Sequence, residues 1–294
     1  MTRVAVIAHA GKSFGGGLGE LRRELARQGV VDPLWVEVPK SRFASKQVRR
    51  LLAEGVELLF VWGGDGTVQR CVDALDGSKT PLAILPAGTA NLLATNLGIP
   101  KDIAGAVEIG LRGARHRLDV GRLNGEHFAV MAGVGFEAAM LEQADGTLKD
   151  RLGRVAYVWT GWQNLRAKPF TAKITVDGVP WYAGPASCIL FGNLGRLFGG
   201  IEVFEDARPD DGKLEVGVVD ADGIVDWLRT LARTALGHAE RSPLVRTTKA
   251  KKIKVKLSRK VLYEVDGGDR TKVRKLDVVV KPRAVTICVP GDER

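Results

Sequence analysis

Apolar and polar positions recur with two periods along the first 115 residues, and this pattern predicts strands separated by helices. Strands are expected at residues 3–8, 33–38, 58–62 and 82–85. Helices are expected at residues 17–28, 45–53 and 89–96, at 102–111, and from Thr67 onward. Strands that alternate with helices indicate βαβ units and a parallel sheet, whose ligand-binding loops gather at one edge.

The pattern changes near residue 117, where short strand-like runs replace this alternation. Strands are expected at residues 117–123, 126–132, 171–176, 187–191, 214–219, 252–257, 262–265, 275–280 and 284–289, with helices at 148–165 and 223–236. Asn124-Gly125, Asp177-Gly178 and Asp211-Gly212 are turn signals typical of hairpins. The sequence therefore predicts an α/β domain over residues 1–117 and a mostly antiparallel β domain over residues 118–283.

Composition places the chain among ordinary globular proteins of about two domains. No apolar run reaches the roughly 18 residues of a membrane-spanning helix, and the N-terminus lacks the apolar region of a signal peptide. The three cysteines, Cys71, Cys188 and Cys288, have no metal-ligand spacing and lie in apolar runs. We expect them to be buried thiols in a cytoplasmic protein.

The net charge of +10 is concentrated near the C-terminus, where residues 241–283 hold fifteen Lys or Arg and four acids. Residues 249–257 alternate apolar and basic side chains, as in an edge or one-sided strand whose lysines discourage further pairing. An anionic membrane surface and nucleic acid are the other interpretations. Nucleic acid is disfavoured, because no exposed aromatic residues are interleaved with the basic ones.

The feature that points most directly to chemistry is the run Gly63-Gly64-Asp65-Gly66-Thr67, which follows a buried strand and precedes a helix. Backbone N–H groups at a helix N-terminus bind phosphate. Gly63 and Gly64 permit positive φ and close approach of a ligand. Asp65 can hold a magnesium-bound water or a nucleotide hydroxyl, and Thr67 can cap the helix and donate to phosphate.

Other phosphate motifs fit less well. Gly11-Lys12-Ser13 resembles the end of a Walker A loop, but Val6 stands where its first glycine is required. Residues 133–138 match the dinucleotide pattern G-x-G-x-x-A, yet they lie in the β half of the chain without a βαβ unit. We interpret that segment as a structural or substrate-facing turn.

The chain resembles the catalytic domain shared by diacylglycerol kinases, sphingosine kinases and soluble bacterial lipid kinases, a fold related to NAD kinase. Residues 63–67 match the family's signature, and residues 85–94, which contain Thr89 and Asn91, match its second motif. Residues 133–138, 198–200 and 207–214 match later motifs, and residues 265–268 align with its Asp-Gly-Glu.

The resemblance implies an N-terminal nucleotide domain of NAD-kinase type, a C-terminal β-sandwich-like domain, and an active site in the cleft between them. Residues 284–294 would return to the first domain. ATP with Mg²⁺ would be bound through the following residues: His9, Gly11, Lys12, Ser13, Gly63, Gly64, Asp65, Gly66, Thr67, Thr89 and Asn91. Asp266 would be the general base, although Asp-Gly-Gly is also good hairpin-turn chemistry.

Bacterial relatives hold a structural Mg²⁺ through two side chains and one backbone carbonyl. Asp211 and the Lys213 carbonyl fit two of these positions, but Arg208 occupies the third and could instead pair with Asp211. We therefore expect this second metal site to be absent or weak. Gly268 also departs from the family, because it stands where glutamate is usual.

The leading hypothesis is an ATP-dependent kinase of a lipid hydroxyl, with diacylglycerol as the favoured acceptor, acting peripherally at an anionic membrane. Oligomeric state is open and includes a homodimer; nucleic acid is not an expected partner. A stripe of Val155, Val158, Trp159, Trp162 and Leu165 predicts either core packing or a lipid-facing wall, and Trp181 and Tyr182 invite the same two interpretations. The alternatives are a kinase of a soluble acceptor, such as NAD, and a non-catalytic nucleotide-binding module.

Overall fold

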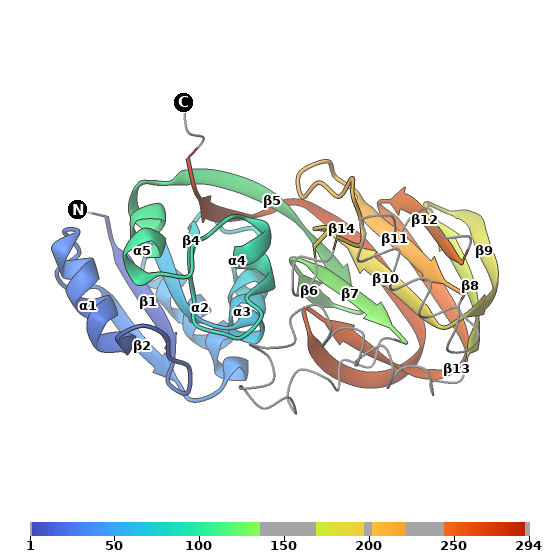
Figure 1. The fold of residues 1–294 in the computed structure, drawn as a ribbon, viewed down its shortest axis with the longest axis horizontal. Coiled ribbons are helices and arrows are strands. Elements are labelled where there is room, and N and C mark those ends of the chain that lie inside the picture. The colour runs from blue at the N-terminus through green and yellow to red at the C-terminus, as the bar shows by residue number, and fades with distance from the viewer. Residues whose placement is uncertain (1, 136–168, 197–201, 221–243, 292–294) are drawn as a thin grey trace. The chain divides into compact units, whose positions relative to one another are not determined.

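A computed structural model describes residues 2–135, 169–196, 202–220 and 244–291 (Figure 1). The chain divides into two compact units, Met1–Val120 with Pro282–Arg294, and Gly121–Lys281. The helices expected at 148–165 and 223–236, the aromatic stripe and the motif at 198–200 lie outside the described residues. In the part of the chain that the structure describes, every helix is too short or too polar to cross a bilayer.

The first unit is built on a parallel sheet, as the alternating pattern predicted. Its strands are β1 (Val4–His9), β2 (Leu34–Val38), β3 (Leu58–Gly63) and β4 (Leu82–Pro86), arranged in the order β2-β1-β3-β4. Beyond β4, Ile287 of the long strand β14 (Gly268–Val289) pairs in parallel with Leu82. β1 and β3 are fully apolar except for His9, because this sheet is buried on both faces.

Helices occupy both faces of this sheet. They are α1 (Gly17–Arg27), α2 (Ala44–Ala53), α3 (Asp65–Leu75), α4 (Leu92–Asn96) and α5 (Ile103–Arg112), with a 3₁₀ turn, η1 (Ser41–Phe43), before α2. α1 packs beside α5 and α2 beside α3. Right-handed crossovers explain why α2 and α3 share the face opposite α1, because the chain moves one way along the sheet from β1 to β2 and the other way from β2 to β4.

Two helix starts differ from the sequence prediction. α3 begins at Asp65, not Thr67, and its N-cap is Gly64 without a side-chain cap, so the predicted capping role of Thr67 is wrong. α4 begins at Leu92, not at residue 89, because Asn91 adopts the left-handed conformation with φ of 49°. Residues 87–91 therefore form a loop between β4 and α4.

The second unit is antiparallel, as predicted. Its strands are the end of β5 (Ala114–Leu123), β6 (Glu126–Phe128), β7 (Met131–Val134), β8 (Phe170–Val176), β9 (Val179–Ala186), β10 (Cys188–Gly192), β11 (Leu214–Val219), β12 (Val245–Ala250), β13 (Lys252–Val265) and most of β14. The order is β12-β11-β10-β7-β13-β14, with β8 on β13 and β9 on β8. Two-residue turns at Asn124-Gly125 and Asp177-Gly178 have positive φ at both positions, as hairpins of this type require.

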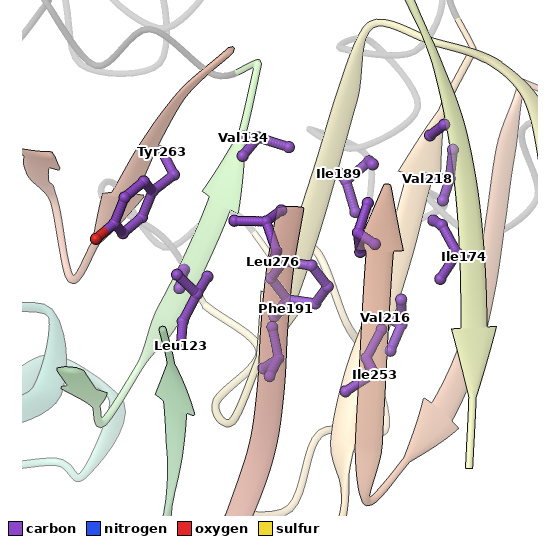
Figure 2. Close-up of a cluster of buried hydrophobic side chains, with 14 of the residues drawn as sticks. Leu123, Val134, Ile174, Ile189, Phe191, Val216, Val218, Ile253, Tyr263 and Leu276 are labelled. Carbon is purple, nitrogen blue, oxygen red and sulfur yellow. The ribbon is translucent and has the colours of Figure 1, made fainter. Parts of the chain in front are cut away.

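The core of the second unit comes from alternate residues of these strands. Figure 2 shows Ile174, Ile253, Phe191 and Val216 converging from β8, β13, β10 and β11, and each is at most 1% exposed. Trp181 and Tyr182 are partly buried against the same cluster, which favours the core-packing interpretation for both. Cys71, Cys188 and Cys288 are buried, as predicted.

Several strand boundaries were wrong. β9 and β12 were missed, since β9 contains two prolines and β12 is largely polar. The runs at 252–257 and 262–265 form one strand, β13, with a register shift between Lys256 and Val261. The expected strand at 126–132 is two strands, β6 and β7, because the intervening backbone N–H groups bind a side chain instead of a neighbouring strand.

Candidate nucleotide site

The candidate site of the first unit lies at the carboxyl edge of the parallel sheet. In the order β2-β1-β3-β4, the loops after β1 and β3 leave neighbouring strands at the point where the strand order reverses. Open α/β sheets bind ligands at this switch point. The Trp62 indole N–H donates to the carbonyl of Lys12 at 2.9 Å, and the Phe14 ring stacks on Trp62 with centroids 4.5 Å apart. The two loops are therefore fixed to each other.

Two glycines where β3 ends, Gly63 and Gly64, are required by close packing. A Cβ on Gly63 would lie 2.6 Å from Cβ of Thr67, and one on Gly64 would lie 3.0 Å from Cα of Gly88. A Cβ on Gly88 would meet Cα of Gly64 at 2.4 Å, so the loops after β3 and β4 touch backbone to backbone. Gly64 has a φ of −92°, so close approach, and not the positive φ that the sequence suggested, explains this glycine.

Asp65 connects these two loops. Its Oδ1 accepts a hydrogen bond of 2.5 Å from the backbone N–H of Leu92, at the start of α4. Burial raises the pKa of Asp65, while backbone N–H groups around Leu92 oppose that rise. The carboxylate thus supports the N-terminus of α4, and this use competes with the predicted contact to a magnesium-bound water.

Asn91 shapes the β4 loop from within. Its Oδ1 accepts from the Gly88 N–H at 2.8 Å, and its Nδ2 donates to the Gly88 carbonyl at 2.9 Å. Asn91 is only 6% exposed, whereas Thr89 is exposed on the same loop. Of the two, Thr89 is the side chain available to a ligand, and Asn91 holds the loop that presents it.

A hydroxyl that the sequence prediction missed lies beside the glycine loop. Thr67 is 1% exposed, and its Oγ1 is 2.9 Å from Oγ of Ser41, in the η1 turn after β2. The residues at the end of β2, Glu37-Val38-Pro39, carry no hydroxyl. The signal lay two residues further, in Lys40-Ser41-Arg42, where a hydroxyl stands between two cations.

The loop after β1 presents several predicted residues to solvent. Gly11, Lys12 and Ser13 are exposed. Nδ1 of His9 accepts from the Gly11 N–H at 3.1 Å, which makes Nε2 the protonated nitrogen of the neutral ring. Burial, together with the Lys12 charge, lowers the pKa of His9. A neutral His9 therefore shapes the loop, while Lys12 supplies the positive charge.

The predicted residues of this unit thus fall into two groups. His9, Gly63, Gly64, Asp65, Thr67 and Asn91 build the loops, through packing and through hydrogen bonds to neighbouring backbone and side chains. The groups that face solvent are the following: Gly11, Lys12, Ser13, Gly66 and Thr89. This edge can bind an anion through the first turn of α3, exposed hydroxyls and the Lys12 ammonium.

Asp266 lies in the second unit, in the two-residue turn that joins β13 to β14. Asp266 and Gly267 have φ of 45° and 76°, and Val265 pairs with Gly268 across the turn. The Asp266 side chain accepts three backbone N–H groups: Oδ2 binds Ala129 at 2.8 Å, and Oδ1 binds Val130 at 2.9 Å and Met131 at 3.0 Å. These donors stabilise the ionised carboxylate and explain why β6 and β7 are separate strands.

The second metal position of the prediction holds an ammonium group. Nζ of Lys249 lies 2.7 Å from Oε1 of Glu215, 2.7 Å from the Asp206 carbonyl and 3.8 Å from Oδ2 of Asp211. Asp211 Oδ1 also accepts from the Lys213 N–H at 2.9 Å. The expected Arg208–Asp211 pair does not form in the described part of the chain, because Lys249 supplies the cation instead.

Magnesium chemistry has limited support from these residues. Across residues 2–135, 169–196, 202–220 and 244–291, no group of three His, Cys, Asp or Glu side chains could hold a metal ion. A nucleotide-bound Mg²⁺ needs no such group, because it retains water and takes phosphate oxygens with one or two carboxylates. The described residues around Asp211 do not fit a resident metal, because the Lys249 ammonium group lies there.

Comparisons with known proteins agree with this architecture. Residues 3–123 match the diacylglycerol kinase catalytic domain, and residues 129–289 match the YegS C-terminal NAD kinase beta sandwich-like domain. A Klebsiella pneumoniae protein named "probable lipid kinase YegS-like" is 30% identical over 76% of this chain and 75% of its own. The diacylglycerol kinase of Bacillus subtilis is 29% identical over 72% of this chain and 71% of its own.

Solved structures extend the likeness to the fold. A diacylglycerol kinase from Bacillus anthracis superposes with a TM-score of 0.79 at 25% identity, covering 98% of this chain and 96% of that chain. The yeast NADH kinase complexed with NADH superposes with a TM-score of 0.57 at 12% identity, covering 99% and 84%, a likeness of fold alone. The chain therefore belongs to the diacylglycerol kinase catalytic-domain family, with a C-terminal domain of the YegS type.

Proposed function

We propose that this protein is a lipid kinase that transfers the γ-phosphoryl group of ATP to the hydroxyl of diacylglycerol and forms phosphatidic acid. The observation that carries the proposal is the β3 loop. Its glycines pack against the β4 loop, and the Ser41–Thr67 hydroxyl pair lies at the first turn of α3, at the switch point of the sheet. The names of relatives that match over most of the chain support a lipid acceptor.

Each part of the first unit has a role in this proposal. Phosphoryl transfer depends on positioning and charge neutralisation, with little covalent chemistry for the protein to perform. Backbone N–H groups of the first turn of α3 would bind phosphate oxygens, and Lys12 would offset their charge. Mg²⁺ bound with ATP would neutralise charge on the transferred group.

Asp266 is the proposed proton acceptor. As the lipid hydroxyl oxygen bonds to the γ-phosphorus, the bond from that phosphorus to the leaving ADP oxygen breaks, and the hydroxyl proton passes to the carboxylate. A base must be ionised to act, and the three N–H donors at Asp266 favour that form. The same donors give Asp266 a structural use, so the turnover and the folding of an Asp266 variant are measured together.

The decisive experiment supplies radiolabelled ATP and Mg²⁺ to the purified protein with a panel of acceptors. The panel holds diacylglycerol, monoacylglycerol, sphingosine, ceramide and NAD. Labelled phosphatidic acid, lost in the Asp266→Asn variant and kept in Asp269→Asn, is the expected result. Asp269 is a matched control, because it is an exposed aspartate on the same hairpin.

Two results would replace the proposal. Phosphorylation of NAD, at a rate indifferent to vesicles, would assign a soluble acceptor. Binding of ATP without any labelled product would assign a non-catalytic nucleotide-binding module. Two features are compatible with a protein that binds ATP without turnover. Gly268 offers no side chain beside Asp266, and Asp266 itself is only 6% exposed.

A further inference from the structure

Three lysines form a row across neighbouring strands of the second unit. Lys256 of β13 lies directly opposite Lys275 of β14 on one side and Lys173 of β8 on the other. All three side chains are exposed. In the next outward row, Lys254 of β13 lies opposite Asp277 of β14 and Thr175 of β8, so that row holds one base and one acid.

These lysines share the outer face of the sheet. Figure 2 shows their neighbours in sequence, Ile174, Ile253 and Leu276, pointing into the hydrophobic core. Successive side chains of a strand point to opposite faces. Lys173, Lys254, Lys256 and Lys275, here named the lysine face, therefore lie together on the side away from the core.

Lysines often prevent a sheet edge from pairing with a further strand, but this role does not explain the lysine face. β13 pairs with β8 and β14 on its two sides, β8 pairs with β13 and β9, and β14 pairs with β13 and β5, so these lysines stand on interior strands. Like charges directly opposite one another in a sheet destabilise it. Within the described residues, none of the four lysines of the lysine face forms an ion pair.

We propose that the lysine face docks the protein on the anionic phospholipid surface of a membrane. Its charge complements a plane of phosphate groups, and the lysine side chains are long enough to reach headgroups while the sheet stays outside the bilayer. The outward residues beside the lysines include Thr171, Thr175, Ala183 and Asp277, and none of these four is aromatic. Single-stranded nucleic acid usually stacks on aromatic side chains, so a lipid surface fits better.

This docking role rests on the proposed lipid kinase activity, since it brings the protein to a substrate that is confined to a membrane. The test is binding to vesicles, which requires no turnover. Sedimentation would compare vesicles of mixed phosphatidylglycerol and phosphatidylcholine with vesicles of phosphatidylcholine alone. The variant K173Q/K256Q/K275Q removes the row and keeps side chains of similar length.

A basic residue near an anionic leaflet strengthens partitioning about fivefold. The triple variant should therefore lose roughly a hundredfold in partition coefficient on anionic vesicles. K46Q/K79Q/K101Q is the matched control, because it removes the same charge from exposed lysines of the first unit. The control should retain most of the binding, and unfolding temperatures should show that both variants fold.

Equal vesicle binding by K173Q/K256Q/K275Q and the native protein would overturn the proposal. Equal losses of binding in K173Q/K256Q/K275Q and in the control K46Q/K79Q/K101Q would overturn it too. Loss of duplex DNA binding with unchanged vesicle binding would assign the lysine face to nucleic acid instead. Turnover of a short-chain diacylglycerol dispersed in solution tests the proposed activity separately. Full turnover there in a variant that no longer binds vesicles would support both proposals.

Discussion

The ammonium group of Lys249 lies 2.7 Å from the carboxylate of Glu215, a side chain that is 7% exposed. Burial raises the pKa of Glu215, against the opposing effect of Lys249. The pKa of Lys249 is raised despite its own burial, because Glu215, Asp211 and Asp206 favour its charged form. A tethered cation therefore neutralises a group of oxygens that a metal ion could otherwise bind.

Replacement of Lys249 by alanine should convert this site into one that responds to divalent cations. The variant leaves the Glu215 carboxylate buried without its partner, which should reduce the free energy of unfolding by about 1–3 kcal/mol. Mg²⁺ or Ca²⁺ should restore part of the loss, since two carboxylates and a carbonyl remain. Thermal unfolding with and without cation measures both effects.

Lys251→Ala is the control for this variant, because Lys251 is an exposed lysine two residues further along the chain. Its unfolding temperature should equal that of the native protein and should not change when Mg²⁺ or Ca²⁺ is added. If Mg²⁺ stabilised the native protein as much as the Lys249→Ala variant, the Lys249 ammonium group would not occupy the place of a metal ion.

Replacement of Asp266 by asparagine should affect stability and turnover separately. Asparagine has one acceptor oxygen, so at least one of the backbone N–H groups of residues 129–131 loses its partner, at a cost of about 1–3 kcal/mol. A general base contributes a factor of about 10²–10⁴ to turnover. If Asp266 is the base, turnover should fall by that factor at temperatures where unfolding measurements show the variant folded. A folded variant with near-native turnover would leave Asp266 with the structural role alone.

The sequence was sufficient for much of the framework. The parallel sheet followed from the alternation of apolar runs with helical patterns, and the loops after β3 and β4 leave its carboxyl edge, as such a sheet requires. Local chemistry also located the turns at Asn124-Gly125 and Asp177-Gly178, because two-residue hairpins demand residues that tolerate positive φ.

The contacts that give each side chain its role could not be predicted in the same way. Leu92 is 27 residues from Asp65, Ser41 is 26 from Thr67, and Ala129 is 137 from Asp266. No periodicity reports which distant backbone N–H group a carboxylate will bind. Asp65 and Asp266 therefore looked like ligands or catalysts in the sequence, and the structure shows that both also hold the backbone of another segment.

Gly88→Ala should disrupt the packing between the β3 and β4 loops. The new Cβ would lie 2.4 Å from Cα of Gly64 and 2.7 Å from Oδ1 of Asn91, so the backbone must shift. Overpacking of this kind costs about 1–3 kcal/mol, and ATP affinity should fall with it. Gly19→Ala is the control, because there is space for the added Cβ. Its nearest neighbour would be a side-chain nitrogen of Arg23 at 3.7 Å. Native ATP affinity and stability in Gly88→Ala would show that the two loops are not in close contact.

The pKa of His9 predicts a pH response of the β1 loop. Because burial and Lys12 lower this pKa below 6.5, the unfolded chain binds the proton more readily. The stabilising contribution is present above pH 6.5 and is lost as the pH falls through the lower pKa of the folded protein. An NMR titration should find the His9 midpoint below 6.5, and Lys12→Gln should move it upward while Lys46→Gln does not. A midpoint at or above 6.5 would remove His9 from this role.

Ser41→Ala tests the hydroxyl that the sequence prediction missed. Loss of the 2.9 Å hydrogen bond to Thr67 should lower the free energy of unfolding by about 1 kcal/mol. ATP binding should weaken about five- to tenfold, because the Thr67 hydroxyl is no longer held in one orientation. Ser45→Ala is the matched control, since the Ser45 hydroxyl donates to the Arg70 carbonyl and lies outside the loop. Calorimetric titration with ATP, applied to Ser41→Ala, Thr67→Ala and the double variant, measures the coupling between the two hydroxyls. If the single losses in ATP affinity simply add, the two hydroxyls do not act as one unit. Native ATP affinity in Ser41→Ala would exclude Ser41 from the nucleotide site.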